Sequence, residues 1–198
     1  MIVFSLFMRK KFKISIFQII VLMLYAIFVG IVTAFLMFYI ENGWWGGQSL
    51  FGVVLFTPIF VILMSFLLKI KYRRVLGIYA FNECIMLAVM KLHCNSVGCC
   101  KGNEFFRDVC PIPLELIESF SLIIILFMLL RIERKHDTFN SLYGYYLIMY
   151  GLSRIILNNF RNNLKSFVWI LPPGHFWAII SIAIGIIYLY KNSIHFKN

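Results

Sequence analysis

Charged residues are scarce in this sequence, and acidic residues are the scarcest of them. Of the 198 residues, 14% are charged, with 8 Asp plus Glu against 19 Lys plus Arg. A disordered chain combines low hydrophobicity with many charges, so this composition excludes disorder. Hydrophobic residues make up 62% of the chain, which is more apolar surface than a soluble core of this size can hide. The mean hydropathy of +0.88 therefore indicates an integral membrane protein.

The basic residues outnumber the acidic ones and give a formal net charge of +11. In a soluble chain this excess would suggest a nucleic-acid partner. Here the basic residues are scattered between apolar runs, and basic residues beside membrane spans orient them. We therefore expect no nucleic-acid partner.

Long apolar runs predict an all-α bundle of about six transmembrane helices. The sequence lacks internal repeats and linkers rich in Pro or Ser, so residues 1–198 are expected to form one polytopic membrane domain. The predicted spans are residues 14–40, 50–68, 75–90, 114–130, 139–157 and 169–190. The first run is too long for the ~7–15-residue core of a signal peptide, so we expect an uncleaved span. Pro58 predicts a kink within the second span.

The distribution of Lys and Arg predicts the orientation of these spans. If both termini lie in the cytoplasm, the inside segments carry 13 Lys and Arg and the outside segments carry 6. This bias satisfies the positive-inside rule. Trp44, Trp45, Trp169 and Trp177 then fall near the outer boundary, where aromatic side chains anchor spans.

Several ionisable residues lie within the predicted spans or at their outer ends. Lys91, Arg154 and Arg161 are at or just inside span ends, Glu115 and Glu118 are in the first turns of the fourth span, and Glu83 interrupts the third. Ionisable groups at membrane depth are costly and usually face a polar cavity, although long basic side chains also reach the headgroups. The shorter side chain of Glu118 reaches the headgroups less easily, so a polar cavity is the better explanation for its carboxylate. We therefore expect an outward-facing polar lipid pocket whose cations neutralise a phosphate, a task suited to the forked donors of Arg.

The sequence also lacks a C-x-x-C pair. Its cysteines are Cys84, Cys94, Cys99, Cys100 and Cys110, four of them in the outside loop after the third predicted span. The residues that a metal site would use are His93, Cys94, Cys99 and Cys110. Their spacing lacks the paired C-x-x-C elements that make zinc motifs specific. The lack of a C-x-x-C pair also argues against thiol-redox chemistry. We expect no metal and no cofactor, and cysteines that pack or form a structural disulfide.

Several segments resemble motifs of the prolipoprotein diacylglyceryl transferase family. Residues 91–102 (KLHCNSVGCCKG) are similar to the segment that opens R-I-G in that family and contains G-C-C-Y-G. Residues 113–118 (PLELIE) resemble P-x-Q-L-Y-E, and residues 150–161 (YGLSRIILNNFR) resemble Y-G-x-x-R-F-x-x-E-F-x-R. Residues 174–175 stand where the family has G-Q, and residues 46–52 (GGQSLFG) are similar to G-G-x-S-F-H-G. The segments follow the family's order.

The chain also departs from the family's pattern. Lys91 stands in place of an arginine, Phe51 in place of a histidine proposed as general base, and Asn158 in place of a glutamate. The family usually has seven spans with its N-terminus outside. Loss of the first span would give six spans with the N-terminus inside, in agreement with the orientation that the charges predict.

The resemblance implies transfer of a diacylglyceryl group from phosphatidylglycerol to the lipobox cysteine of a prolipoprotein signal peptide, in the bacterial inner membrane. The expected catalytic residues are Glu118, Arg154 and His93, with His93 as a replacement base. The expected substrate-binding residues are Lys91, Gly98, Gly102, Arg161 and His175.

Two alternatives remain open at the level of sequence. The substitutions at Phe51 and Asn158 favour a catalytically degenerate relative that binds lipid or a membrane partner. A membrane thiol oxidoreductase would instead use Cys94 with Cys99 or Cys100.

Overall fold

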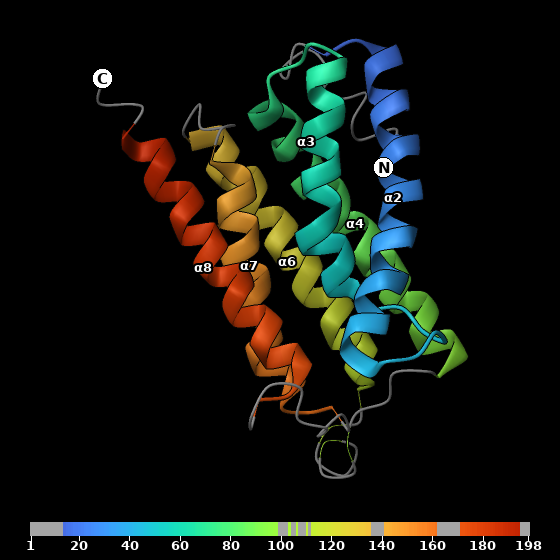
Figure 1. The fold of residues 1–198 in the computed structure, drawn as a ribbon. Helices are drawn as coiled ribbons and strands as arrows, with labels where there is room; N and C mark the ends of the chain where they lie inside the picture. Colours follow the sequence, from blue (N-terminus) through green and yellow to red (C-terminus); the bar gives the residue numbers. More distant parts are fainter. Residues whose placement is uncertain are drawn as a thin grey trace. The chain divides into compact units, whose positions relative to one another are not determined.

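The protein, described here from a computed structural model, is built from helices (Figure 1). The structure describes residues 14–98, 103, 106, 110, 112–135, 141–161 and 171–194. Its helices are α2 (Ile16–Asn42), the π-helical η1 (Gly52–Phe56), α3 (Thr57–Leu67), α4 (Tyr72–Val97), α6 (Leu114–Lys135), α7 (Leu142–Asn158) and α8 (Pro173–Ile194). The predicted all-α class is confirmed.

The helices overlap the six predicted spans. α4 is longer than the predicted span 75–90, and α6 continues to Lys135, beyond the predicted end at residue 130. Residues 139–140 and 169–170, which begin the fifth and sixth predicted spans, lie outside the described residues. By length and composition, three of the described helices could cross a membrane, namely α2, α4 and residues 173–192 of α8, and residues 52–67 form a shorter apolar helix. The single domain and the orientation in the membrane stay predictions.

The chain divides into two compact units between Asn82 and Glu83, inside α4. In the first unit, α2 has well-formed ends. The Ser15 hydroxyl accepts a hydrogen bond from the Gln18 backbone N–H at 3.2 Å, and the Gln18 side chain accepts from the Ser15 N–H at 3.0 Å. This capping box satisfies two backbone donors that a helix start leaves unpaired. At the other end, Gly43 has a φ of 75° and its N–H donates to the Tyr39 carbonyl at 2.7 Å, as in a left-handed helix cap.

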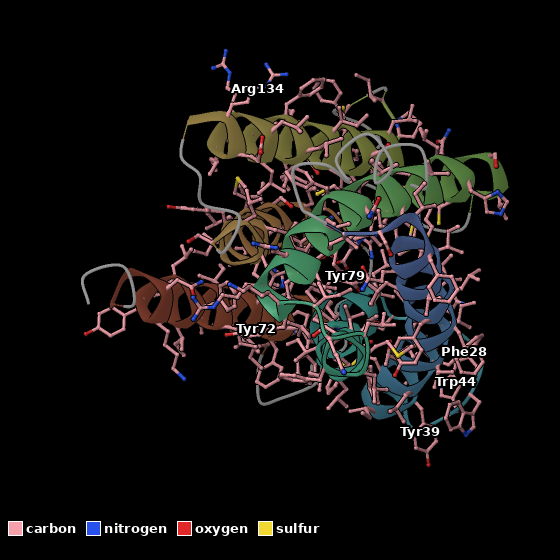
Figure 2. All side chains as sticks on the ribbon, turned by 90° about the horizontal axis from the view of Figure 1, so that it is seen from above. Phe28, Tyr39, Trp44, Tyr72, Tyr79 and Arg134 are labelled. Carbon is pink, nitrogen blue, oxygen red and sulfur yellow. The ribbon has the colours of Figure 1, made fainter. Side chains whose placement is uncertain are left out.

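Aromatic side chains gather at the C-terminal end of α2. The Tyr39 ring stacks on Trp45 with a centroid separation of 4.5 Å, and Phe38 meets Trp44 edge-on at 5.3 Å. Figure 2 shows Phe28, Tyr39 and Trp44 on the outward side of α2, and all three are exposed. These contacts fit the expected role of Trp44 and Trp45 as interfacial anchors.

A π-helical turn, η1, precedes Pro58. In a π-helix, the N–H of residue 58 would donate to the Val53 carbonyl, but proline has no N–H. The Tyr79 hydroxyl donates to that carbonyl instead, at 2.9 Å. The hydroxyl groups of Thr33 and Thr57 lie 2.8 Å apart and join α2 to the start of α3. The hydrogen bond from Tyr79 therefore satisfies the Val53 carbonyl, and the contact between Thr33 and Thr57 fixes the end of the turn against α2.

In the second unit, α7 and α8 lie side by side (Figure 1) and pack closely because glycines face the contact. A Cβ atom at Gly151 would lie 2.8 Å from the Ala178 carbonyl oxygen, and one at Gly185 would lie 2.8 Å from the Gly144 carbonyl oxygen. Close packing through small residues is typical of helices in membranes. The Ser181 hydroxyl adds a hydrogen bond to the Leu147 carbonyl at 3.0 Å.

Candidate functional site

A buried carboxylate with three cationic partners lies in the second unit. The carboxylate belongs to Glu118, in the second turn of α6, and its side chain is 2% exposed. Lys91 Nζ lies 2.6 Å from Glu118 Oε2, and Arg154 Nη1 lies 3.1 Å from Oε1. Arg161 donates from Nε to Oε1 at 2.9 Å and from Nη2 to Oε2 at 2.8 Å. We call Lys91, Glu118, Arg154 and Arg161 the Glu118 cluster.

A hydrogen bond beside the Glu118 cluster joins α4 and α6. The Ser119 hydroxyl donates to the Ala88 carbonyl at 3.1 Å. Ser119 follows Glu118, and Ala88 lies three residues before Lys91, on the same side of α4. The Ser119 bond therefore brings the Lys91 side chain and the Glu118 carboxylate to the same level of the bundle.

Arg154 is oriented by a tyrosine one turn earlier in α7. Its Nε donates to the Tyr150 hydroxyl at 3.0 Å, and its guanidinium carbon lies 5.1 Å from the centre of the Tyr150 ring. Both residues are buried. Because Nε is held by tyrosine, the Nη1 end of the guanidinium points at Glu118.

Arg161 forms the accessible side of the Glu118 cluster. Its side chain is 22% exposed, against 5% for Arg154 and 3% for Lys91. It lies just beyond the end of α7, where its backbone N–H donates to the Asn158 carbonyl at 3.2 Å. A ligand that approaches the cluster therefore meets Arg161 first.

The Glu118 cluster carries more positive than negative charge. Three cations share one carboxylate, which leaves a formal surplus of two positive charges. Buried charges are costly unless they are paired. A buried excess of cations is therefore suited to an anionic ligand, and the two guanidinium groups offer the forked donors that phosphate oxygens accept.

The structure thus brings together four of the residues expected at the site. His93 is exposed on α4, two residues after Lys91 and so about 200° further round the helix. Its side chain faces away from the Glu118 cluster, and its role as a base stays a prediction. Gly98 ends α4 with a φ of 71° and donates its N–H to the Cys94 carbonyl at 2.8 Å, a conformation that favours glycine. Gly102 lies outside the described residues.

His175 lies in the first turn of α8 and contacts the end of α7. Its Nε2 lies 3.2 Å from Asn159 Oδ1. Asn158 lies against Gly174, where a Cβ atom would be 2.5 Å from Asn158 Nδ2. Asn159 carries no signal of a site residue in the sequence, because a solitary asparagine after a helix is usually a simple cap.

The described cysteines are Cys84, Cys94 and Cys110, and of these Cys84 and Cys110 are free thiols. Cys99 and Cys100 lie outside the described residues. Within the described ranges, no group of three or more His, Cys, Asp or Glu side chains is arranged to hold a metal ion.

Comparison with known proteins identifies a family. The family model for prolipoprotein diacylglyceryl transferase matches residues 1–191 of the 198-residue chain. The match includes every residue of the Glu118 cluster and His175. The chain matches no curated protein and no solved structure.

Proposed function

Because the chain belongs to the prolipoprotein diacylglyceryl transferase family, we propose that it transfers the diacylglyceryl group of phosphatidylglycerol to the lipobox cysteine of a prolipoprotein signal peptide. Family membership and the long apolar helices make it a membrane protein. We place it in the bacterial plasma membrane with both termini in the cytoplasm, the orientation that the excess of inside Lys and Arg favours.

The charge of the Glu118 cluster is the observation that carries this proposal. In the reaction, the thiol sulfur bonds to the glyceryl carbon, the bond from that carbon to the phosphate oxygen breaks, and glycerol phosphate leaves with the electron pair. The thiol proton passes to a base. The phosphate thus changes from a diester with one negative charge to a monoester with nearly two. A surplus of two positive charges stabilises the departing group more than the bound lipid, and such differential binding accelerates a reaction.

Each residue of the Glu118 cluster has a role in this proposal. Arg161 binds the phosphate first, because it is the most exposed of the cations. Arg154 and Lys91 lie deeper and add the charge that the leaving group needs. Glu118 holds the cations in place before the lipid arrives. The nucleophilic thiol belongs to the signal peptide, so the reaction requires no cysteine of this chain, and His93 stays the candidate for the base.

Transfer of labelled diacylglyceryl from phosphatidylglycerol to a lipobox peptide tests the proposal. The purified protein should label a peptide that carries the cysteine and leave a peptide with serine at that position unlabelled. Arg161→Gln should lower the rate by about 100-fold, the scale of losing a donor to developing negative charge. The control is Arg134→Gln, which changes an exposed arginine in the last turn of α6 (Figure 2) and should leave the rate within about twofold.

A catalytically degenerate relative is the second candidate, supported by Phe51 and Asn158 at two family positions. This candidate predicts that the wild-type protein binds phosphatidylglycerol through Arg161 without transferring any label. Equal losses in the Arg161 and Arg134 variants would contradict both candidates, because the phosphate would then bind away from the Glu118 cluster.

A further inference from the structure

One buried donor and one buried acceptor are left without partners where α7 meets α8. Among the described residues, neither Asn158 Nδ2 nor His175 Nδ1 has a hydrogen-bond partner, although both atoms are buried. Buried polar atoms in folded proteins are usually hydrogen-bonded, so an unpaired donor and acceptor on neighbouring residues indicate a missing group. The two residues are neighbours in space, because Gly174 precedes His175 and a Cβ atom at Gly174 would lie 2.5 Å from Asn158 Nδ2.

The hydrogen bonds of Asn159 determine which nitrogen of His175 carries the proton. Asn159 Nδ2 donates to the Ile155 carbonyl at 2.9 Å, which orients the amide so that Oδ1 faces His175. Amide oxygens only accept, so His175 Nε2 must be the donor in this pair. In a neutral imidazole, Nδ1 then has a free lone pair and is an acceptor. The unpaired atom of His175 therefore requires a donor.

The unpaired amide nitrogen of Asn158 requires the opposite kind of partner, an acceptor. A hydroxyl group satisfies both atoms at once, because it donates one hydrogen bond and accepts others. The same group fits if the amide of Asn158 is turned the other way, since a hydroxyl can also bind an amide oxygen.

The Glu118 cluster adds a second requirement on the ligand. Asn158 and Arg161 lie within one turn of chain, joined by the 3.2 Å bond from the Arg161 N–H to the Asn158 carbonyl. His175 contacts the next residue, Asn159, so Asn158, Arg161 and His175 all lie around the end of α7, and the side chains of Asn158 and His175 are only half-buried. The matching ligand carries a hydroxyl a few bonds from a phosphate.

We propose that Asn158 and His175 bind a hydroxyl of the glycerol headgroup and so select phosphatidylglycerol among anionic phospholipids. This inference rests on the proposed function, because it assumes that the phosphate of the lipid binds the Glu118 cluster. The hydroxyl donates to His175 Nδ1 and accepts from Asn158 Nδ2, while Asn159 holds the imidazole in the required tautomer.

Phosphatidylpropanol is the probe that isolates the hydroxyl. It has the charge and the diester of phosphatidylglycerol but lacks both headgroup hydroxyls. The full-length protein is placed in phosphatidylcholine nanodiscs with either lipid, of matched acyl chains, and bound lipid is measured by native mass spectrometry. The wild-type protein should bind phosphatidylglycerol about tenfold more tightly, since phosphatidylpropanol leaves the buried pair unsatisfied.

The variants His175→Phe and Asn158→Leu keep the size of each side chain and remove one hydrogen-bonding group. Each should bind both lipids equally, near the level of wild type with phosphatidylpropanol, and this residual binding shows that the variant is folded. Asn42→Leu is the matched control, because Asn42 is exposed at the end of α2 and donates to the Phe38 carbonyl. It should keep the tenfold preference.

Two results would overturn the inference. Equal binding of the two lipids by the wild-type protein, or an unchanged preference in both variants, would show that the pair does not bind the headgroup and would leave the proposed function standing. Failure of the wild-type protein to bind either anionic lipid above the phosphatidylcholine background would overturn the proposed function, and the inference with it.

Discussion

At the scale of single residues, Glu118 balances the charge of the candidate site. Its two oxygens receive hydrogen bonds or ion pairs from Lys91, Arg154 and Arg161, and these residues come from α4, α7 and the turn after α7. A carboxylate with several cationic partners keeps them from repelling one another. Its loss therefore acts on the packing of three segments as well as on ligand binding.

We expect Glu118→Gln to lower the stability of the protein strongly. The amide keeps the shape of the side chain but leaves three cations without a counter-charge, and removing one partner of a buried ion pair costs about 3–5 kcal/mol. The midpoint of thermal unfolding in detergent, followed by tryptophan fluorescence, measures this loss. Glu41→Gln is the control, since Glu41 is less buried and its hydrogen bond comes from a neutral Ser49 hydroxyl at 2.9 Å.

A second substitution tests the cause of the instability. Adding Lys91→Met to Glu118→Gln removes one of the repelling cations and should recover part of the lost midpoint. The role of Glu118 as counter-charge to the three cations is wrong if the Glu118 and Glu41 variants unfold at the same temperature. It is also wrong if adding Lys91→Met lowers the midpoint further.

At the scale of elements, close approach of backbones decides how the helices pack. Gly52 begins η1 and lies against α2 so closely that a Cβ atom would clash with the Thr33 carbonyl oxygen. Gly30 in α2 is less crowded, since its nearest neighbours would lie 3.7 Å from a Cβ atom. The two glycines of the same unit therefore tolerate a methyl group to different degrees.

We expect Gly52→Ala to destabilise the protein by about 1–3 kcal/mol, the usual cost of overpacking. Gly30→Ala should be neutral or stabilising by about 0.5–1 kcal/mol, because alanine favours the helix and the methyl group has room. Chemical denaturation of both variants in mild detergent compares them directly. A smaller loss at Gly52 than at Gly30 would show that the contact between η1 and α2 is looser than described.

At the scale of the whole molecule, the residues of the candidate site belong to one of the two compact units. Lys91, Glu118, Arg154, Arg161 and His175 all follow the division between Asn82 and Glu83. The segment similar to G-G-x-S-F-H-G, residues 46–52, belongs to the first unit. The charges of the Glu118 cluster are therefore assembled by α4, α6, α7 and the turn after α7.

The orientation of the molecule in the membrane is tested by labelling introduced cysteines in a variant without native cysteines. Lys71→Cys and Arg134→Cys should resist an impermeant thiol reagent added outside intact cells, because the 13-to-6 bias of Lys and Arg places them in the cytoplasm. Gln48→Cys, in the exposed segment after α2, should react. The opposite pattern would invert the predicted orientation.

The class of the protein and the candidate residues of its site follow from local patterns in the sequence. Hydropathy is a local property, so apolar runs predicted an all-α membrane protein, and the cost of burying charge singled out six ionisable residues, of which Lys91, Glu118, Arg154 and Arg161 form the Glu118 cluster. The resemblance to the transferase family, carried by short local motifs, also needed no structure.

Which of these residues meet depends on how the helices pack. The bonds from Arg154 and Arg161 to Glu118 span 36 and 43 residues of sequence, and packing, not periodicity, sets such contacts. The same holds for His175, whose proton position depends on Asn159, just after the end of α7. His93 follows Lys91 by two residues, and the rotation of about 100° per residue in an α-helix turns it to another face of α4; its role as a base stays a prediction. Local sequence patterns predict which residues are helical and which are buried. The direction of a side chain relative to groups far away in the sequence depends instead on how the helices pack.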